Sequence, residues 1–217
     1  MARGRFITFE GGEGAGKTTQ ARRLADHIMA RGHQVVVTRE PGGSPFAEKV
    51  RDLALEAFEP GPCQLAETLL FNAARADHLD KVIRPALDRG RWVICDRFLD
   101  STRVYQGEVG GLEEGVLDSL DEIVVAGTRP DLTVVIDLDP VVGLARVEQR
   151  RGAASARDVD RFETRGADYH EKLREGFLKI ARREPIRFVV VDGFQSVDLL
   201  SADICGHVDA RLFRGGR

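Results

Sequence analysis

Residues 11–18 read G-G-E-G-A-G-K-T and match the pattern G-x-x-x-x-G-K-[ST] at every fixed position. The run R-F-I-T-F at 5–9 has the composition of a buried strand, and residues 19–30 have a helical pattern. A glycine loop between a strand and a helix aims backbone N–H groups and the helix dipole at a polyphosphate. The stretch therefore predicts a P-loop that binds a nucleoside triphosphate.

The loop also carries side chains suited to phosphoryl chemistry. Lys17 can reach the terminal phosphates, and the Thr18 hydroxyl can ligate Mg²⁺. The expected ATP-binding residues are Gly11, Gly12, Glu13, Gly14, Ala15, Gly16, Lys17, Thr18 and Thr19.

Strand-like and helix-like segments alternate along the rest of the chain. Strands are expected at residues 5–9, 34–38, 92–95, 132–137 and 187–191. Helices are expected at residues 17–31, 45–57, 64–89, 112–126, 141–151, 161–184 and 196–212. The alternation predicts an α/β P-loop NTPase fold with a five-stranded parallel sheet flanked by helices. We expect one domain over residues 1–217, with a short arginine-rich lid at about 150–161.

Composition limits the classes of function. The 217 residues are 42% hydrophobic, and no apolar run approaches the ~20 residues that span a bilayer. The first residues lead straight into a strand, so no signal peptide is expected. Three isolated cysteines indicate a reducing cytosol and hence a cytoplasmic protein. A net charge of −3 argues against nucleic acid or a membrane as partner.

Two of the predicted strands end in residues suited to binding phosphate. Arg39 lies in T-R-E-P-G-G at 38–43, which predicts a turn that faces the ligand or is only structural. Asp96 can orient Mg²⁺ or its waters, and the planar guanidinium of Arg97 can hold a second phosphate. The alternative is an Asp96–Arg97 ion pair that caps the strand.

Helical spacing places a ring and two polar side chains on one stripe. Phe71, Arg75 and His78 stand at i, i+4 and i+7, so they could stack on a base and hydrogen-bond its edge. The alternative places Phe71 in the core and Arg75 on the surface.

Six arginines and no lysine lie between Arg146 and Arg165. A closing lid would deliver arginines to the charge on the transferring phosphate and would exclude water. The alternative is a solvated helix face whose arginines pair with acids such as Glu148 and Asp158.

In this order and spacing, the motifs resemble those of the bacterial-type thymidylate kinases (dTMP kinases) over nearly the whole chain. The matching segments are F-E-G-G-E-G-A-G-K-T-T at 9–19, T-R-E-P-G-G at 38–43, A-A-R-A-D-H at 73–78, D-R-F at 96–98, S-T-R-V-Y-Q-G at 101–107, R-P-D-L-T at 129–133, D-R-F-E at 160–163 and V-D-G at 191–193. The T-R-E-P-G-G and Y-Q-G segments distinguish this family from adenylate, guanylate and uridylate kinases.

The resemblance implies Mg²⁺-dependent transfer of the ATP γ-phosphoryl group to dTMP, for dTTP biosynthesis, by a homodimer. Phe71 would stack on thymine, Arg75 would bond its edge, and a cis peptide would precede Pro41. The implied catalytic residues are Lys17, Arg97, Arg151 and Arg161, and the expected metal-site residues are Thr18 and Asp96. The implied dTMP site comprises Glu13, Arg39, Phe71, Arg75, Arg97, Ser101, Thr102, Tyr105 and Gln106.

Three features depart from the family pattern. Gly14 stands where some members carry a P-loop arginine, which the bacterial type supplies from the lid, and Arg151 is the closest match. The lid is longer here, so the assignment among the lid arginines stays open between Arg150, Arg151, Arg157 and Arg161. Phe98 replaces the Tyr or His that the family uses after its Asp-Arg pair.

Two other functions stay open at this point. The same fold could phosphorylate another monophosphate or a deoxynucleoside, although Arg39 and Arg97 favour a phosphorylated acceptor. A GTPase-type switch would use an N-K-x-D motif to read its base, and the sequence has none.

Overall fold

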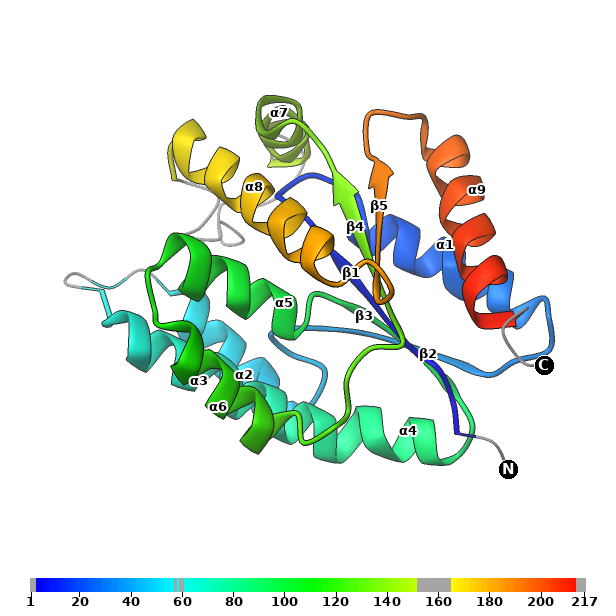
Figure 1. Cartoon of the computed structure of the whole chain (residues 1–217), viewed down its shortest axis with the longest axis horizontal. Coiled ribbons are helices and arrows are strands. Elements are labelled where there is room, and N and C mark those ends of the chain that lie inside the picture. Colours follow the sequence, from blue (N-terminus) through cyan, green and yellow to red (C-terminus); the bar gives the residue numbers. More distant parts are fainter. Residues whose placement is uncertain (1–2, 57, 59–60, 152–164, 214–217) are drawn as a thin grey trace.

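Five parallel strands form the centre of the structure, a computed structural model that describes residues 3–56, 58, 61–151 and 165–213 (Figure 1). The strands are Phe6–Glu10 (β1), Val35–Arg39 (β2), Trp92–Asp96 (β3), Leu132–Asp137 (β4) and Phe188–Asp192 (β5). Each predicted strand is present within one residue of its expected ends, and the sheet order is β2-β3-β1-β4-β5. The α/β fold class predicted from the sequence is confirmed.

The register places the ends of the strands at one edge of the sheet. In the centre, β1 pairs with both β3 and β4, so that Ile7 aligns with Ile94 and Leu132. The last residue of each strand is charged, and these residues gather where α/β proteins bind their ligands. These residues are Glu10, Arg39, Asp96, Asp137 and Asp192.

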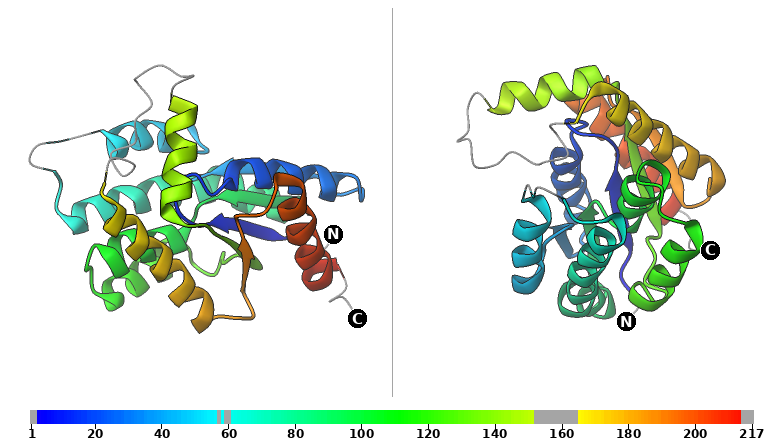
Figure 2. Two further views of the ribbon diagram at one scale, coloured as in Figure 1. Left: turned by 90° about the horizontal axis from the view of Figure 1, so that it is seen from above. Right: turned by 90° about the vertical axis from the view of Figure 1, so that its left-hand side faces the viewer.

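Helices cover both faces of the sheet (Figures 1 and 2). On one face, Leu24 and Ile28 of α1 and Ile204 of α9 share a core with the strands. The other face carries two clusters, one over the segment at 79–88 and one over the segments at 103–109 and 167–183. The long helices are Lys17–Met29 (α1), Pro45–Leu55 (α2), Gln64–His78 (α3), Glu114–Val124 (α6), Pro140–Arg151 (α7), Ala167–Arg183 (α8) and Val197–Val208 (α9).

Several predicted helices differ in their bounds. The helix expected at 64–89 is α3 followed by a π-helical turn, Leu79–Ile83 (η1), and a short helix, Arg84–Asp88 (α4). The helix expected from residue 161 begins at Ala167, because Arg165 and Gly166 are not helical, and residues 161–164 lie outside the described part. The last helix, α9, is followed by another π-helical turn, Asp209–Phe213 (η4).

The sequence reading missed one helical segment, and that segment lies in the site. Leu99–Thr102 (α5) and the π-helical Arg103–Val109 (η2) directly follow β3. Three β-branched residues and Gly107 lower helix propensity here. Burial compensates, because Val104 is fully buried and Tyr105 is 7% exposed against α8.

A close helix contact holds that segment in place. Gly176 of α8 faces η2 so closely that a Cβ there would lie 2.8 Å from Val104 Cγ1. We predict that Gly176→Leu lowers the free energy of unfolding by about 1–3 kcal/mol through overpacking, measured by urea denaturation. Gly206→Leu in α9 is the matched control, because a Cβ there meets nothing within 4 Å. Equal stability of the two variants would contradict the packing argument.

Candidate active site at the carboxyl edge of the sheet

The P-loop adopts a conformation that depends on its glycines. Gly11, Gly14 and Gly16 have φ angles of 132°, 69° and 96°, in the region that favours glycine. A Cβ at Gly14 would also lie 2.1 Å from the carbonyl oxygen of Gly143. The backbone therefore leaves no space for an arginine side chain at position 14. This explains sterically why the chain has Gly14 where some family members carry a P-loop arginine.

Lys17 begins α1 and turns back over the loop. Its ammonium donates to the carbonyl oxygens of Gly11 and Gly12, at 3.0 and 2.7 Å. Burial and the charge of Arg97 lower the pKa of Lys17, while nearby carboxylates oppose the shift. The loop thus places a buried cation where a triphosphate would lie.

Thr18 and Asp96 are brought together as predicted. The Thr18 hydroxyl, in the first turn of α1, donates to Oδ2 of Asp96, the last residue of β3, at 2.5 Å. Both are hard oxygen ligands of the kind that Mg²⁺ takes, and Mg²⁺ usually fills its shell with waters and phosphate oxygens. Among the described residues, no three His, Cys, Asp or Glu side chains form a metal cluster. The pair therefore fits an ion that is bound mainly through nucleotide and water.

A pocket of about 600 Å³, its open mouth included, lies beside the P-loop. All the residues of the predicted acceptor set except Arg39 line it. The lining residues are Glu13, Glu40, Pro41, Arg51, Leu55, Phe71, Arg75, Arg97, Phe98, Ser101, Thr102, Tyr105 and Gln106. Segments far apart in the sequence thus converge on one cavity.

Arg97 joins the pocket to the P-loop. Its Nη2 donates to both carboxylate oxygens of Glu13, at 2.8 and 2.9 Å, and its guanidinium lies 5.1 Å from the centre of the Tyr105 ring. The Tyr105 hydroxyl donates to Glu13 at 2.6 Å. Burial would raise the pKa of Glu13, but the charges of Arg97 and Lys17 and the Tyr105 hydrogen bond lower it to about 2. Arg97 has φ +67°, a backbone conformation that is uncommon for a residue with a side chain.

Two buried polar side chains, Arg75 and Gln106, also line the pocket. Arg75 is 3% exposed, and its guanidinium lies 5.2 Å from the centre of the Phe98 ring. The side-chain amide of Gln106 donates to Glu67 at 2.7 Å, which points its carbonyl oxygen the other way. Phe98, which replaces the family's Tyr or His, is fully buried and packs edge-on against Phe6. It forms an apolar wall rather than a polar contact.

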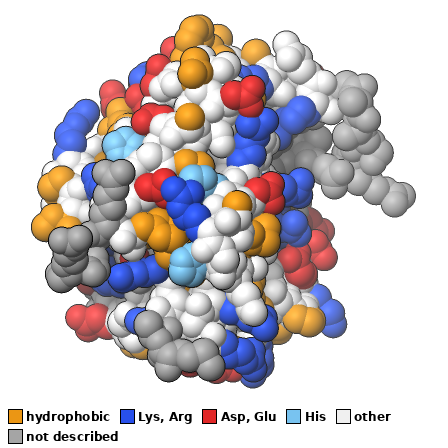
Figure 3. Space-filling view, turned by 90° about the vertical axis from the view of Figure 1, so that its right-hand side faces the viewer, with side chains coloured by type: hydrophobic (Ala, Val, Ile, Leu, Met, Phe, Trp, Pro, Cys, Tyr) orange, Lys and Arg blue, Asp and Glu red, His pale blue; other side chains and the backbone are white. Residues whose placement is uncertain are grey.

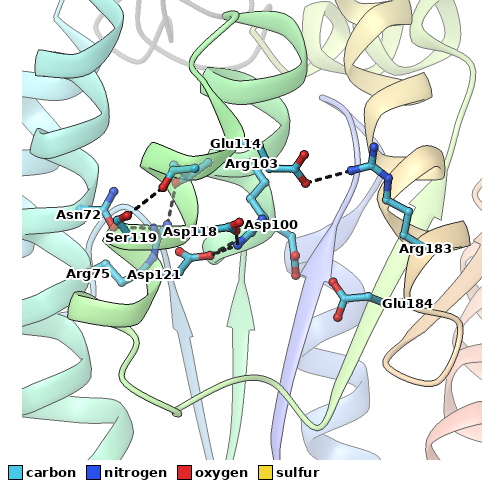
Figure 4. A network of polar contacts seen from close by, with 12 residues as sticks. Asn72, Arg75, Asp100, Arg103, Glu114, Asp118, Ser119, Asp121, Arg183 and Glu184 are labelled. Atoms are coloured by element: carbon cyan, nitrogen blue, oxygen red, sulfur yellow. Dashed lines mark hydrogen bonds and ion pairs between the residues drawn. The ribbon is translucent and has the colours of Figure 1, made fainter.

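A charged network lies next to the pocket-lining segment. Arg103 of η2 pairs with Asp118 at 2.7 Å and with Asp121 at 2.6 Å, both on α6 (Figure 4). Burial raises the pKa of Asp121, while the charges of Arg103 and Arg75 oppose the shift. The network anchors the helical turn that carries Thr102, Tyr105 and Gln106 to α6.

Some predicted residues are not in the pocket. Arg39 is exposed and donates to Glu48 Oε2 at 2.9 Å. Among the lid arginines, Arg150 is exposed at the end of α7, and nothing is described for the side chain of Arg151. Arg157 and Arg161 lie outside the described residues. The structure therefore brings most of the predicted acceptor residues into one pocket, and the lid arginines Arg157 and Arg161 lie outside its described part.

The sequence reading missed Glu40, Pro41, Arg51 and Leu55. Arg39, the last residue of β2, is exposed, whereas Glu40 directly after the strand is 5% exposed and lines the pocket. The bond before Pro41 is cis, as the resemblance implied. Arg51 and Leu55 stand at i and i+4 on α2, a spacing that could have been recognised.

A P-loop beside a base-sized, arginine-containing pocket defines a P-loop kinase that acts on a nucleotide. The family model for thymidylate kinase matches residues 9–204. The chain therefore belongs to the thymidylate kinase family, whose members phosphorylate dTMP to dTDP.

Individual relatives agree with this assignment. The thymidylate kinase of Caulobacter vibrioides is 52% identical over 212 residues, which cover 98% of this chain and 99% of the relative. That of Nitrobacter winogradskyi is 49% identical over 93% of this chain and 86% of its own length. The crystal structure of thymidylate kinase from Ehrlichia chaffeensis matches with a TM-score of 0.75 and 33% identity, and the match covers 95% of this chain and 99% of that one.

A buried carboxylate links the P-loop strand to the pocket. Glu10, the last residue of β1, accepts from the backbone N–H groups of Phe98 and Ser101 at 2.9 and 3.2 Å and from the Ser101 hydroxyl at 2.6 Å. Burial raises the pKa of Glu10 to about 7, and the charge of Asp100 adds to the rise against these hydrogen bonds.

This raised pKa predicts a pH dependence of stability. Between pH 4.5 and about 7 the folded state holds a proton on Glu10 that the unfolded chain has released, so its contribution to stability falls as pH rises. We expect Glu10→Gln to remove a slope of up to about 1.4 kcal/mol per pH unit, measured by urea denaturation at pH 5 and pH 7. A variant with the wild-type slope would show that Glu10 is already ionised at pH 5.

Proposed function

We propose that this protein transfers the γ-phosphoryl group of ATP, bound with Mg²⁺, to the 5′-phosphate of dTMP, giving dTDP and ADP. One observation carries the proposal. The pocket beside the P-loop has an aromatic wall at Phe71, a buried arginine at its inner end and Arg97 at its P-loop end. This order matches a nucleoside monophosphate whose base points inward and whose phosphate points toward ATP.

The chemistry needs no general base, because the attacking phosphate oxygen is already anionic. Catalysis is then positioning and charge stabilisation. The P-loop amides and Lys17 would hold the ATP phosphates, and Arg97 would hold the dTMP phosphate. Thr18 and Asp96 would hold Mg²⁺ and its waters, and the ion neutralises phosphate charge when it is bound.

The groups that face the base favour a keto pyrimidine. Arg75 presents N–H donors and Gln106 presents a carbonyl acceptor, which complement a ring carbonyl and the adjacent ring N–H. Tyr105 is held over Glu13 and would crowd the 2′ position of the sugar. Ser101 and Thr102 complete this end of the site.

The proposal also covers the domain organisation and the oligomeric state of the protein. We expect a single catalytic domain over residues 1–217 that forms a homodimer. In support, α2 and α3 expose the apolar side chains Phe46, Leu53, Leu65 and Leu69. Within the described residues no helix is long and apolar enough to cross a membrane.

The partners would be small molecules rather than nucleic acid. On the side that carries α1 and α9, acidic, basic and apolar side chains are interspersed, and no broad basic patch stands out (Figure 3). The free cysteines Cys63, Cys95 and Cys205 support a cytoplasmic location.

Acceptor choice tests the proposed function. We expect dTMP to give the highest kcat/KM in a coupled assay of ADP formation over a panel of monophosphates and thymidine. The value for dUMP should be lower, because a missing methyl group in an apolar pocket costs roughly 1–3 kcal/mol. A higher kcat/KM for AMP, CMP or GMP would assign the fold to another monophosphate, and a higher value for thymidine would assign a nucleoside acceptor.

The lid arginines form a separate prediction. We propose that Arg151 and Arg161 place charge on the transferring phosphate, since side chains at Gly14 are excluded. Arg151→Ala and Arg161→Ala should lower kcat by ~10³-fold with little change in substrate KM. Arg150→Ala and Arg157→Ala test the alternative assignments, and Arg182→Ala on the exposed side of α8 is the control. If all four lid variants kept the wild-type kcat, the charge would come from another element.

A further inference from the structure

A buried carboxylate lies behind Arg75, and nothing in the mechanism above uses it. Glu40 is 5% exposed and follows β2 at the start of the turn. Its Oε2 accepts from Arg75 Nε at 2.7 Å, and its Oε1 lies 3.1 Å from His78 Nδ1. A carboxylate can only accept, so His78 Nδ1 carries the proton of that hydrogen bond. Glu40 therefore bridges two residues of α3 that stand nearly one turn apart.

The contacts of Arg75 account for most of its hydrogen-bonding capacity. A guanidinium has five N–H donors in a rigid plane. Nε bonds Glu40, and Nη2 bonds the carbonyl oxygen of Phe98 and the Thr102 hydroxyl, each at 3.0 Å. Nη1 makes a long contact of 3.4 Å with Asn72 Oδ1. One Nη1 hydrogen has no partner among the described residues, and Arg75 lines the pocket.

The second partner of Glu40, His78, is itself held in place by its neighbours. The other ring nitrogen of His78, Nε2, lies 2.7 Å from Thr38 Oγ1, and His78 is fully buried. The backbone of the turn fits tightly around this pair, because a Cβ at Gly43 would lie 2.3 Å from His78 Nε2. The imidazole is thus held between Thr38 and Glu40, and this contact helps to fix the position of Glu40.

We propose that Glu40, supported by His78, is a positioning residue that locks the plane of Arg75 and thereby makes the acceptor site select a carbonyl over an amino group at C4 of a pyrimidine. The inference deepens the proposed function and rests on it. A C4 carbonyl accepts from the free Nη1 hydrogen. A C4 amino group presents its own hydrogens to that donor, and two facing donors leave both groups unpaired in a buried site.

The selection requires that the guanidinium cannot turn. An arginine without its Nε partner could rotate away from an amino group or admit a water between them. Glu40 prevents this because its bond to Nε is a charge-assisted hydrogen bond between buried groups. Specificity would thus come from a residue that stands behind the base-reading arginine rather than beside the base.

Glu40→Gln tests the proposal, with 5-methyl-dCMP as the probe because it differs from dTMP only in the amino group at C4 and the ring proton that this removes. We expect the ratio of kcat/KM for dTMP to that for 5-methyl-dCMP to fall by roughly 10-fold or more. The KM for dTMP should rise, while the KM for ATP stays unchanged. Glu184→Gln is the matched control, since Glu184 also accepts from an arginine Nε, that of Arg187, outside the pocket.

Two His78 variants keep the test decisive if Glu40→Gln does not fold. His78→Asn retains an N–H donor toward Glu40, whereas His78→Leu removes it. The base ratio should fall in the Leu variant and be restored in the Asn variant. A folded Glu40→Gln or His78→Leu protein with the wild-type ratio would overturn the proposal. So would equal losses with both pyrimidines, which indicate a structural role alone.

A binding measurement separates this inference from the proposed function. Calorimetric Kd values for dTMP and 5-methyl-dCMP, taken without ATP, report Arg75 geometry whether or not phosphoryl transfer occurs. If the wild type binds dTMP but does not phosphorylate it, the proposed function fails while the Glu40 ratio can still hold. If the wild type phosphorylates dTMP and the ratio of Kd values is unchanged in Glu40→Gln, only the inference fails.

Discussion

The ion pair between Arg97 and Glu13 joins the two halves of the site, and the rest of the arrangement depends on it. Glu13 belongs to the P-loop, and Arg97 follows β3, which is the neighbour of β1 in the sheet. A buried charge without a partner is strongly unfavourable, so each residue keeps the other at the junction. The Tyr105 hydroxyl adds a third element, because it donates to the same carboxylate. The pocket therefore cannot move far relative to the P-loop without breaking this half-buried ion pair.

A second carboxylate, that of Glu10, stabilises the backbone directly after Arg97. Glu10 accepts the hydrogen bonds that begin α5, directly after the unusual backbone of Arg97. A residue at positive φ costs of order 1 kcal/mol or more and persists only when its surroundings fix it. Glu10 and Glu13 hold the backbone and the side chain of Arg97 respectively. Such fixing suits the proposed role of Arg97, which would present its guanidinium at one place toward the acceptor phosphate.

The sequence predicted the sheet and the P-loop closely, and it did so for physical reasons. Strands buried on both faces read as continuous apolar runs, and the loop pattern follows from its glycine geometry. The helical turns at 99–109 were missed because their residues have weak helix propensity, and only burial against α8 and α6 makes them helical. Arg39 was expected in the pocket, but a turn motif does not say which side chain of a strand end faces inward. Glu40 does so here, which no local pattern in a single sequence shows.

The residues proposed for base recognition and those proposed for phosphoryl transfer lie on different elements. The pocket residues proposed to face the base lie on α3, α5 and η2, which are packed against the sheet and tied by Glu40, Glu67 and Asp121 to their neighbours. The arginines proposed to stabilise the transferring phosphate belong instead to α7 and the segment after it. Base selection requires donors and acceptors fixed before the ligand arrives, because a mobile donor can accommodate the wrong base. Charge on the moving phosphate is needed only during transfer, when water must be excluded. If Glu40 acts as proposed, a buried carboxylate behind the pocket serves base selection, whereas the lid arginines would serve the chemical step.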